Sequence, residues 1–314
     1  MNFYSSISPI IKILLISSLG IILVELKWIN SQVLKFLINL LVKICVPCLI
    51  FSNMMKHKDI FWNTHWSNFL ILSIVIFTVG MCLSSIILLF KNFPFKREFM
   101  MLVSFQNCGY LPMNISLFLF PKILHHQFLI AIFVYLVGFN ILMWSWGVVF
   151  LSRKKLNQLD LKTLFTPPVW ITIASFLTLY FRIDKFIPSL IIDTTYTLGN
   201  TSFVLSLLVL GATLWEERYF LKKHFLKYIW GAVFLKLIAI PLIVYCSINN
   251  STYLDPLTKV FIFIQASMPS AASLPIIASF AQRDKGFISA GVFISHLFSI
   301  ITVPIVLNIV LKYL

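Results

Sequence analysis

The chain has 314 residues, of which 60% are hydrophobic and only 11% are charged, and its mean hydropathy is +0.95. Because a soluble domain of this size could not cover its surface with so little charge, the composition indicates an integral membrane protein. The formal net charge of +15 does not indicate nucleic-acid binding, because the basic residues lie in short loops and no soluble domain is present to hold a binding patch.

Long, continuous apolar runs predict an all-α membrane protein with about ten spanning helices. The runs are close to the 20 or so residues that a helix needs to cross the hydrocarbon layer of a bilayer. The predicted spans are 7–26, 33–55, 66–90, 97–120, 126–151, 167–182, 188–214, 225–248, 256–282 and 287–312. They form two halves, residues 1–151 and 167–314, joined by a polar loop at 152–166.

The first apolar run, residues 7–26, has the alternative interpretation of a secretory signal peptide. However, it has no basic segment before it, it contains Lys12, and it ends in VELKW rather than in small residues. Signal peptides have the opposite features, so we expect this run to be the first span.

The distribution of basic residues predicts the orientation of the chain. The loops after the first, third, fifth, seventh and ninth spans hold fifteen of the 25 lysines and arginines. By the positive-inside rule these loops, including 152–166, face the cytoplasm, and both termini face outward. We expect the protein in the plasma membrane, which is the inner membrane of a bacterium.

Two predicted spans contain polar and helix-breaking residues near their middle. The sequence FQNCGYLPMN occupies 105–114, and QASMPSAASLP occupies 265–275. Proline removes a backbone donor, glycine weakens a helix, and an unpaired amide at membrane depth costs several kcal/mol. Pro112 and Pro269 are 157 residues apart, which is half of the chain.

Each break therefore lies in the fourth span of a five-span half. Halves with an odd number of spans have opposite orientations, so the pattern is typical of an inverted repeat with two discontinuous helices. Irregular backbone at membrane depth is expected where it lines a cavity, so we expect the breaks to cross near the midplane. Helix N-termini at such a crossing favour a carboxylate. The alternative is two proline kinks whose polar groups are satisfied by neighbouring helices.

Polar groups near the breaks and in other spans are the candidate substrate-binding residues. They are Asn107, Gly109, Pro112, Asn114, Ser267, Pro269 and Ser270 in or beside the breaks, with Lys43 and Asn200 in other spans. Lys43 and Lys236 both lie in mid-span, where an ammonium group could create a positive field for an anion. Pairing with carbonyls or snorkelling to the interface explains both lysines equally well.

Asp193, Gln265 and His296 are the candidate residues for binding a coupling ion. A carboxylate at a helix N-terminus also explains Asp193, and a structural hydrogen bond also explains His296. No pair of carboxylates lies near either break. Transport of the substrate coupled to sodium, transport coupled to protons and uncoupled transport therefore all stay open. Apart from such an ion, no cofactor is expected.

Several motifs are similar to those of one transporter family. They are NCGYLP at 107–112, PCLIF at 47–51, TPPVW at 166–170, LGN and LLVLGATL within 198–214, and MPSAASLPIIASFAQRD at 268–284. With these motifs, the chain resembles the auxin efflux carrier family of membrane transporters, which includes bacterial permeases.

The resemblance implies ten helices in two domains. Spans 1, 2, 6 and 7 would form a support domain, and spans 3–5 and 8–10 a transport domain that contains the crossing broken helices. It also implies transport of organic anions such as auxin-like acids or dicarboxylates. The bile-acid and sodium symporter family shares this general architecture and is the nearest alternative.

The sequence favours a carrier over other classes of membrane protein. It contains no Gly-x-Ser-x-Gly motif, histidine box or pair of catalytic aspartates, so an enzyme is not expected. An anion channel, with the breaks lining an open pore, stays an alternative. The expected partners are a small organic anion and the lipid bilayer, and a homodimer is one alternative for the oligomeric state.

Overall fold

The computed structural model describes residues 3–62, 66–89, 93–152, 166–249 and 251–311. Within these ranges every regular element is a helix, and the one β interaction is an isolated bridge between Gln106 and Ser270. Seven of the described helices are long and apolar enough to cross a membrane. Three shorter apolar helices, at Tyr110–Leu119, Pro167–Tyr180 and Pro256–Ala266, accompany them. The architecture is therefore that of a multi-pass membrane protein.

Helices occupy all of the apolar runs described above. The first half contains α1 (Phe3–Glu25), α2 (Ser31–Leu40), η1 (Leu41–Cys45), α3 (Val46–Lys56), α4 (Lys58–Trp62), α5 (Trp66–Leu89), α6 (Lys96–Ser104), α7 (Tyr110–Leu119), α8 (Lys122–Leu142), η2 (Met143–Gly147) and α9 (Val148–Ser152). The second half contains α10 (Pro167–Tyr180), η5 (Ile183–Phe186), α11 (Ser189–Glu217), η6 (Arg218–Phe220), α12 (Lys223–Phe234), η7 (Leu235–Ala239), α13 (Ile240–Asn249), α14 (Pro256–Ala266), α15 (Leu274–Phe280) and α16 (Gly286–Val310). The predicted connecting loop lies almost entirely outside the described residues.

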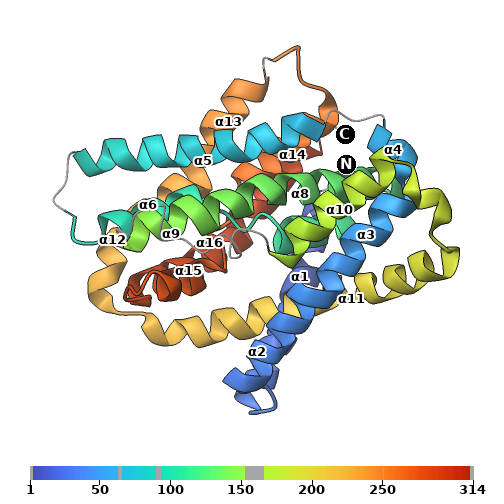
Figure 1. The fold of residues 1–314 in the computed structure, drawn as a ribbon. Coiled ribbons are helices and arrows are strands. Elements are labelled where there is room, and N and C mark those ends of the chain that lie inside the picture. The colour runs from blue at the N-terminus through green and yellow to red at the C-terminus, as the bar shows by residue number, and fades with distance from the viewer. Residues whose placement is uncertain (1–2, 63–65, 90–92, 153–165, 250, 312–314) are drawn as a thin grey trace.

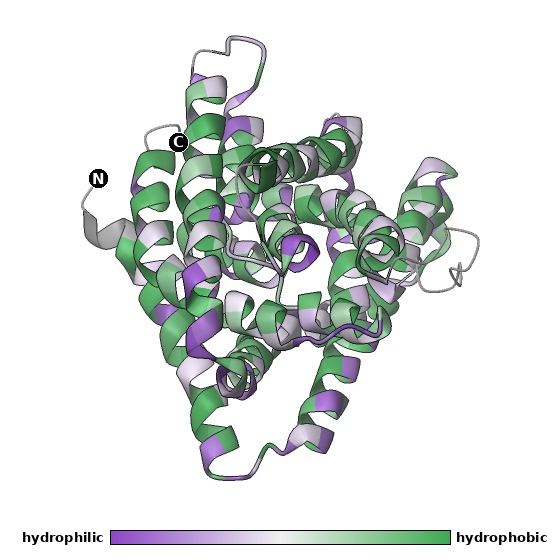
Figure 2. Ribbon diagram, turned by 90° about the vertical axis from the view of Figure 1, so that its left-hand side faces the viewer, coloured by the Kyte–Doolittle hydropathy of each residue, from purple (hydrophilic) through white to green (hydrophobic). Residues whose placement is uncertain are grey.

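The surface of the helices is strongly apolar. Large hydrophobic side chains are exposed on many of them, as at Leu15, Leu89 and Leu190. In Figure 2 hydrophobic residues predominate along the helices. Such a surface is stable against lipid chains rather than water.

Close helix packing joins α1, α3, α10 and α11 into one group. Gly20 of α1 faces the backbone of Leu208, and Gly211 of α11 faces the backbone of Ser17, with no room for a Cβ at either glycine. Small residues at helix contacts are how membrane helices gain close packing. A second group contains α5, α6, α8, α12, α14 and α16, and α5 runs beside α8 across the molecule (Figure 1).

In the part of the chain that the structure describes, three spanning helices contain a π turn: η1, η2 and η7. The turn η1 ends where the Val46 N–H donates to the Leu41 carbonyl, and η7 ends where the Ile240 N–H donates to the Leu235 carbonyl. Pro47 and Pro241 follow directly, and neither can donate to the preceding turn. Lys43 and Lys236 lie within these two π turns, which often mark functional positions.

The interruptions of the two broken helices lie close to the predicted positions. Residues 105–109 separate α6 from α7, and residues 267–273 separate α14 from α15. Pro269 lies inside its interruption. Pro112, however, is the third residue of α7, so it does not itself interrupt the helix. The N–H groups of a first helical turn have no helical acceptor, so a proline at this position loses no hydrogen bond.

Candidate functional site

The two interruptions cross each other through main-chain hydrogen bonds. The Asn107 N–H donates to the Pro269 carbonyl at 2.7 Å, and the Ala271 N–H donates to the Phe105 carbonyl at 2.9 Å. These bonds form the antiparallel bridge between Gln106 and Ser270. Each irregular segment thus satisfies polar main-chain groups of the other that no helix satisfies.

Hydroxyl groups hold the second interruption in place. Ser267 Oγ donates to the Phe263 carbonyl at 2.7 Å, and Ser270 Oγ donates to the Leu102 carbonyl at 2.8 Å. The Ser270 N–H donates to Ser295 Oγ at 3.2 Å. Both Ser267 and Ser270 are buried and do not line the cavity described below, so their hydroxyls stabilise the crossing.

In the first interruption, Gln106 links a buried lysine to a tyrosine. Lys236 Nζ lies 3.5 Å from Gln106 Oε1, and Gln106 Nε2 donates to the hydroxyl of Tyr135. Lys236 is 1% exposed and Tyr135 is fully buried. The amino group of Lys236, in η7, therefore lies directly behind the crossing.

Asn107 binds a histidine of α16. Its Nδ2 lies 3.1 Å from His296 Nε2, and His296 Nδ1 lies 2.9 Å from the Val292 carbonyl. Because a carbonyl oxygen only accepts, Nδ1 carries the hydrogen and Nε2 accepts from the Asn107 amide. The hydrogen bonds assign a neutral imidazole with a defined tautomer.

Two buried amides near the crossing each have one oxygen without a donor among the described residues. Gln265 Nε2 donates to the Cys108 carbonyl at 3.1 Å, but Gln265 Oε1 has no partner. Asn114 Nδ2 donates to Ser206 Oγ at 3.0 Å, but Asn114 Oδ1 has no partner. Buried carbonyl-type oxygens without donors are suited to a cation or a protonated ligand group.

A cavity of about 600 Å³ lies against the crossing. Its volume falls within the range of about 300–1,000 Å³ that is usual for small-ligand sites. Among the described lining residues, Lys43 is the one with an ionised side chain. The other lining residues that carry polar or aromatic groups are Asn39, Gln106, Asn107, Tyr110, Phe139, Asn140, Trp144, Thr166, Thr213, Ser273 and Phe280.

The N-terminus of α7 also reaches this cavity. Gly109 and Tyr110 line it, and the first turn of α7 has no side-chain cap. Uncapped N–H groups and the positive end of the helix dipole favour a negative charge. Lys43 and the N-terminus of α7 therefore both contribute positive potential to the cavity lining.

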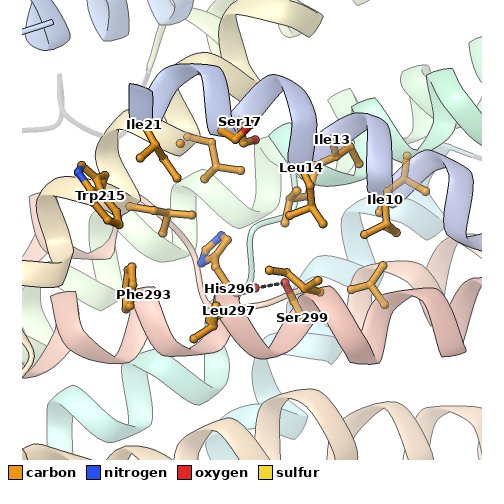
Figure 3. Close-up of a pocket in the computed structure, with 18 residues that line it drawn as sticks. Ile10, Ile13, Leu14, Ser17, Ile21, Trp215, Phe293, His296, Leu297 and Ser299 are labelled. Carbon is orange, nitrogen blue, oxygen red and sulfur yellow. Dashed lines mark hydrogen bonds between the residues drawn. The ribbon is translucent and has the colours of Figure 1, made fainter. Parts of the chain in front are cut away.

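A second cavity, of about 320 Å³, lies between α1, α7, α11 and α16. In Figure 3 the His296 ring projects from α16 toward α1, among aliphatic side chains. Since Asn107 lines the first cavity and His296 lines the second, their hydrogen bond lies between the two cavities.

The structure brings most of the predicted residues together, but Asn200 and Asp193 lie elsewhere. Asn200 is exposed on α11 and does not line the cavity, contrary to the expectation that it faces the crossing. The neighbouring Gly199 packs on the backbone of Leu49, and the next helical residue is rotated by about 100° away from that contact. Asp193 instead forms an ion pair with Lys56 at 2.7 Å.

Sequence reasoning did not single out several of the cavity residues. Tyr110, Phe139, Asn140 and Trp144 belong to apolar runs whose inward face the sequence does not mark. Lys236 was recognisable as a charge in mid-span, but its contact with Gln106 joins residues 130 positions apart. Such a contact follows only from the tertiary fold.

Comparison with protein families covers nearly the whole chain. A family model described as membrane transport protein matches twice, at residues 5–160 and 151–307. A search of curated proteins finds no match to the chain. With both halves of the sequence matched, the chain belongs to the membrane transport protein family, that of the auxin efflux carriers, and it is a membrane transporter.

Proposed function

We propose that this protein is a secondary transporter that moves a small organic anion, such as a carboxylate or an auxin-like acid, by alternating access at the crossing of its broken helices. The observation that carries the proposal is the cavity at the crossing, whose one ionised lining side chain among the described residues is Lys43. A cavity with a basic group and no acidic group selects for negative charge.

The walls of the cavity suit an anion with an apolar body. Lys43 and the uncapped start of α7 would hold the carboxylate. The side-chain amide of Asn107 would form a hydrogen bond with the anion. The rings of Tyr110 and Trp144 would contact the rest of the molecule. Behind the crossing, the amino group of Lys236 contacts Gln106 and would not touch the ligand.

The finer architecture is part of the same proposal. Ten spans would form two inverted five-span repeats, residues 1–151 and 167–314, with α6–α7 and α14–α15 as the fourth span of each. Two successive family matches, each covering about half of the chain, support this division. In this topology both termini face outward and the loop at 152–166 is cytoplasmic, in the plasma membrane.

Alternating access would arise from movement between two groups of helices. The group of α1, α3, α10 and α11 is packed through glycine contacts and would act as the support. The broken helices are joined by main-chain bonds and would move as one body. Rocking of one body against the other would expose the crossing to each side of the membrane in turn.

Sodium-coupled transport is the second candidate, and the unpartnered Gln265 Oε1 and Asn114 Oδ1 favour it. These oxygens would bind Na⁺ in place of water. Proton coupling would require a titratable group, for which His296 is the candidate at the crossing. Anion movement driven only by the membrane potential would need neither a sodium site nor a titratable group.

Thermal unfolding of the purified protein with a panel of small carboxylates tests the substrate class. A ligand present at 100 times its Kd should stabilise the fold by about 2.7 kcal/mol. Measurements with and without sodium, and at two pH values, identify the coupling ion. If no carboxylate changes the unfolding curve but a cation or a neutral compound does, the proposed substrate class is wrong.

Flux into proteoliposomes then separates a carrier from a channel. Saturable uptake that is accelerated by unlabelled substrate on the opposite side indicates alternating access. Ohmic current with single-channel steps would indicate a pore and would contradict the proposal.

A further inference from the structure

The second cavity is a groove along two membrane-spanning helices. Its walls come from Ile10 to Ile21 of α1 and from Phe293 to Val303 of α16, and Trp215 of α11 closes one end (Figure 3). Both walls use the central part of their helices, α1 (Phe3–Glu25) and α16 (Gly286–Val310), and both helices have the length and hydropathy of spans. The groove is therefore at the depth of the lipid chains.

The groove is open to its surroundings on one side. Leu297, which lines it, is 52% exposed. At this depth the exposed side faces hydrocarbon, so a water-soluble ligand or a soluble protein has no access to it. An empty apolar space of this size would forfeit many dispersion contacts, which disfavours an unfilled groove.

Its polar groups are nearly all occupied by the protein itself. Both ring nitrogens of His296 have partners, in Asn107 and the Val292 carbonyl. Ser299 Oγ donates to the His296 carbonyl at 2.6 Å. Ser17 Oγ is the one lining hydroxyl without a partner among the described residues. Such a lining offers little to a headgroup or to a polar ligand, but it complements an aliphatic chain.

We propose that this groove binds one acyl chain of a membrane phospholipid, which packs against His296 between α1 and α16. The chain fills a volume of about 320 Å³ that no side chain of the described residues occupies. It also supports the face of His296 opposite to Asn107, so occupancy of the groove helps to hold the hydrogen bond at the crossing. This site is separate from the proposed anion cavity and does not depend on the identity of the substrate.

Photo-crosslinking in vesicles tests the site. The full-length protein is reconstituted in phosphatidylcholine vesicles that contain a small fraction of phosphatidylcholine with a diazirine in one acyl chain. After irradiation, the labelled peptides are mapped by mass spectrometry. The proposal predicts labelling concentrated on residues 10–21 and 293–303, above the labelling of other exposed apolar positions such as Leu89 and Leu190.

Leu297→Trp gives the decisive variant, because it places a large ring in the groove from an already exposed position. Each CH₂ group excluded from the groove costs about 0.8 kcal/mol, so exclusion of two lowers groove labelling roughly tenfold. Ile301→Trp is the matched control: Ile301 lies one turn away on α16, is 64% exposed and does not line the groove. It should leave the labelling unchanged.

A second variant makes the test independent of how α16 tolerates tryptophan. Leu14→Trp fills the groove from α1, and Leu15→Trp, on the adjacent exposed position, is its control. Uniform labelling of all exposed surfaces, or groove labelling that persists in both filling variants, would overturn the proposal.

Discussion

In the first helix break, Gln106 and Asn107 carry amide groups at the cavity wall, whereas the second break lines the cavity with the methyl groups of Ala271 and Ala272 and the hydroxyl of Ser273. The hydroxyls of Ser267 and Ser270 donate to the main-chain carbonyls of Phe263 and Leu102. The two breaks are related in position along the two halves of the chain. Under the proposed function, their side chains would bind the ligand in the first break and stabilise the crossing in the second.

The helices that follow the two breaks also differ in length. After the first break, α7 has ten residues and begins at the cavity without a side-chain cap. After the second, α15 has only seven residues and likewise begins without a side-chain cap, at Ser273. Because aligned peptide dipoles add along a helix, the longer α7 creates the stronger field for an anion. We therefore expect substitutions in the first break to change ligand binding and substitutions in the second to change stability.

The largest effect is expected for Asn107→Ala. A hydrogen bond to a charged group contributes about 1.5–3 kcal/mol, so affinity for the carboxylate that best stabilises the parent protein should fall about 10- to 150-fold. Calorimetric titration of the purified protein measures the Kd. A variant that folds and binds this carboxylate with parental affinity would show that the first break is not the recognition element.

Lys43→Gln is expected to have a smaller effect on binding. Lys43 is an exposed residue on the cavity wall, so solvent screens its charge and its loss should weaken anion binding by about 1 kcal/mol, or roughly fivefold. Lys56→Gln is the control for a general loss of positive charge, because Lys56 lies outside the cavity and pairs with Asp193. Equal losses in the two variants would mean that only net charge matters.

Ser270→Ala tests whether the second break contributes to stability rather than to ligand binding. It removes the hydroxyl that donates to the Leu102 carbonyl, so the free energy of unfolding should fall by about 1 kcal/mol. Thermal unfolding measures this loss, and the Kd for the carboxylate should stay at the parental value. A large rise in Kd with unchanged stability would reverse the roles assigned to the two breaks.

Asn200→Ala should have the smallest effect. Asn200 is an amide in a predicted span but is exposed and lies outside the cavity. Its replacement should change stability by no more than about 0.5 kcal/mol and leave affinity unaltered. Comparison of its Kd with that of Asn107→Ala shows whether position at the break, rather than the amide group itself, determines binding. A loss of affinity similar to that of Asn107→Ala would place Asn200 in the binding site.

The helical segments and their interruptions were predictable because they depend on local chemistry. Apolar runs of spanning length predicted the helices. Gly109 and Pro269 predicted irregular backbone close to the positions at which the structure has it. The side on which a residue lies was harder to predict when the whole helix is apolar. Asn200 therefore had no sequence signal to show that it faces outward, since both faces of α11 contain hydrophobic residues.

The contacts across the crossing were beyond sequence reasoning for a different reason. Asn107 and His296 are 189 residues apart, and Gln265 and Cys108 are 157 residues apart. These pairs depend on the relative depth of separate helices. The π turns η1 and η7 add a residue to a turn and so change which face their lysines occupy, an effect that a regular 3.6-residue period does not include.

The crossing itself is held by the main chain, through the Asn107 N–H to Pro269 carbonyl bond and the Ala271 N–H to Phe105 carbonyl bond. Every amino acid except proline can donate such a bond, and every amino acid, including Pro269 here, can accept one. The backbone of the crossing therefore does not depend on which side chains are proposed to contact the ligand. Gene duplicates of such a transporter could exchange residues 106 and 107 and acquire new substrates step by step, while each intermediate keeps a folded crossing.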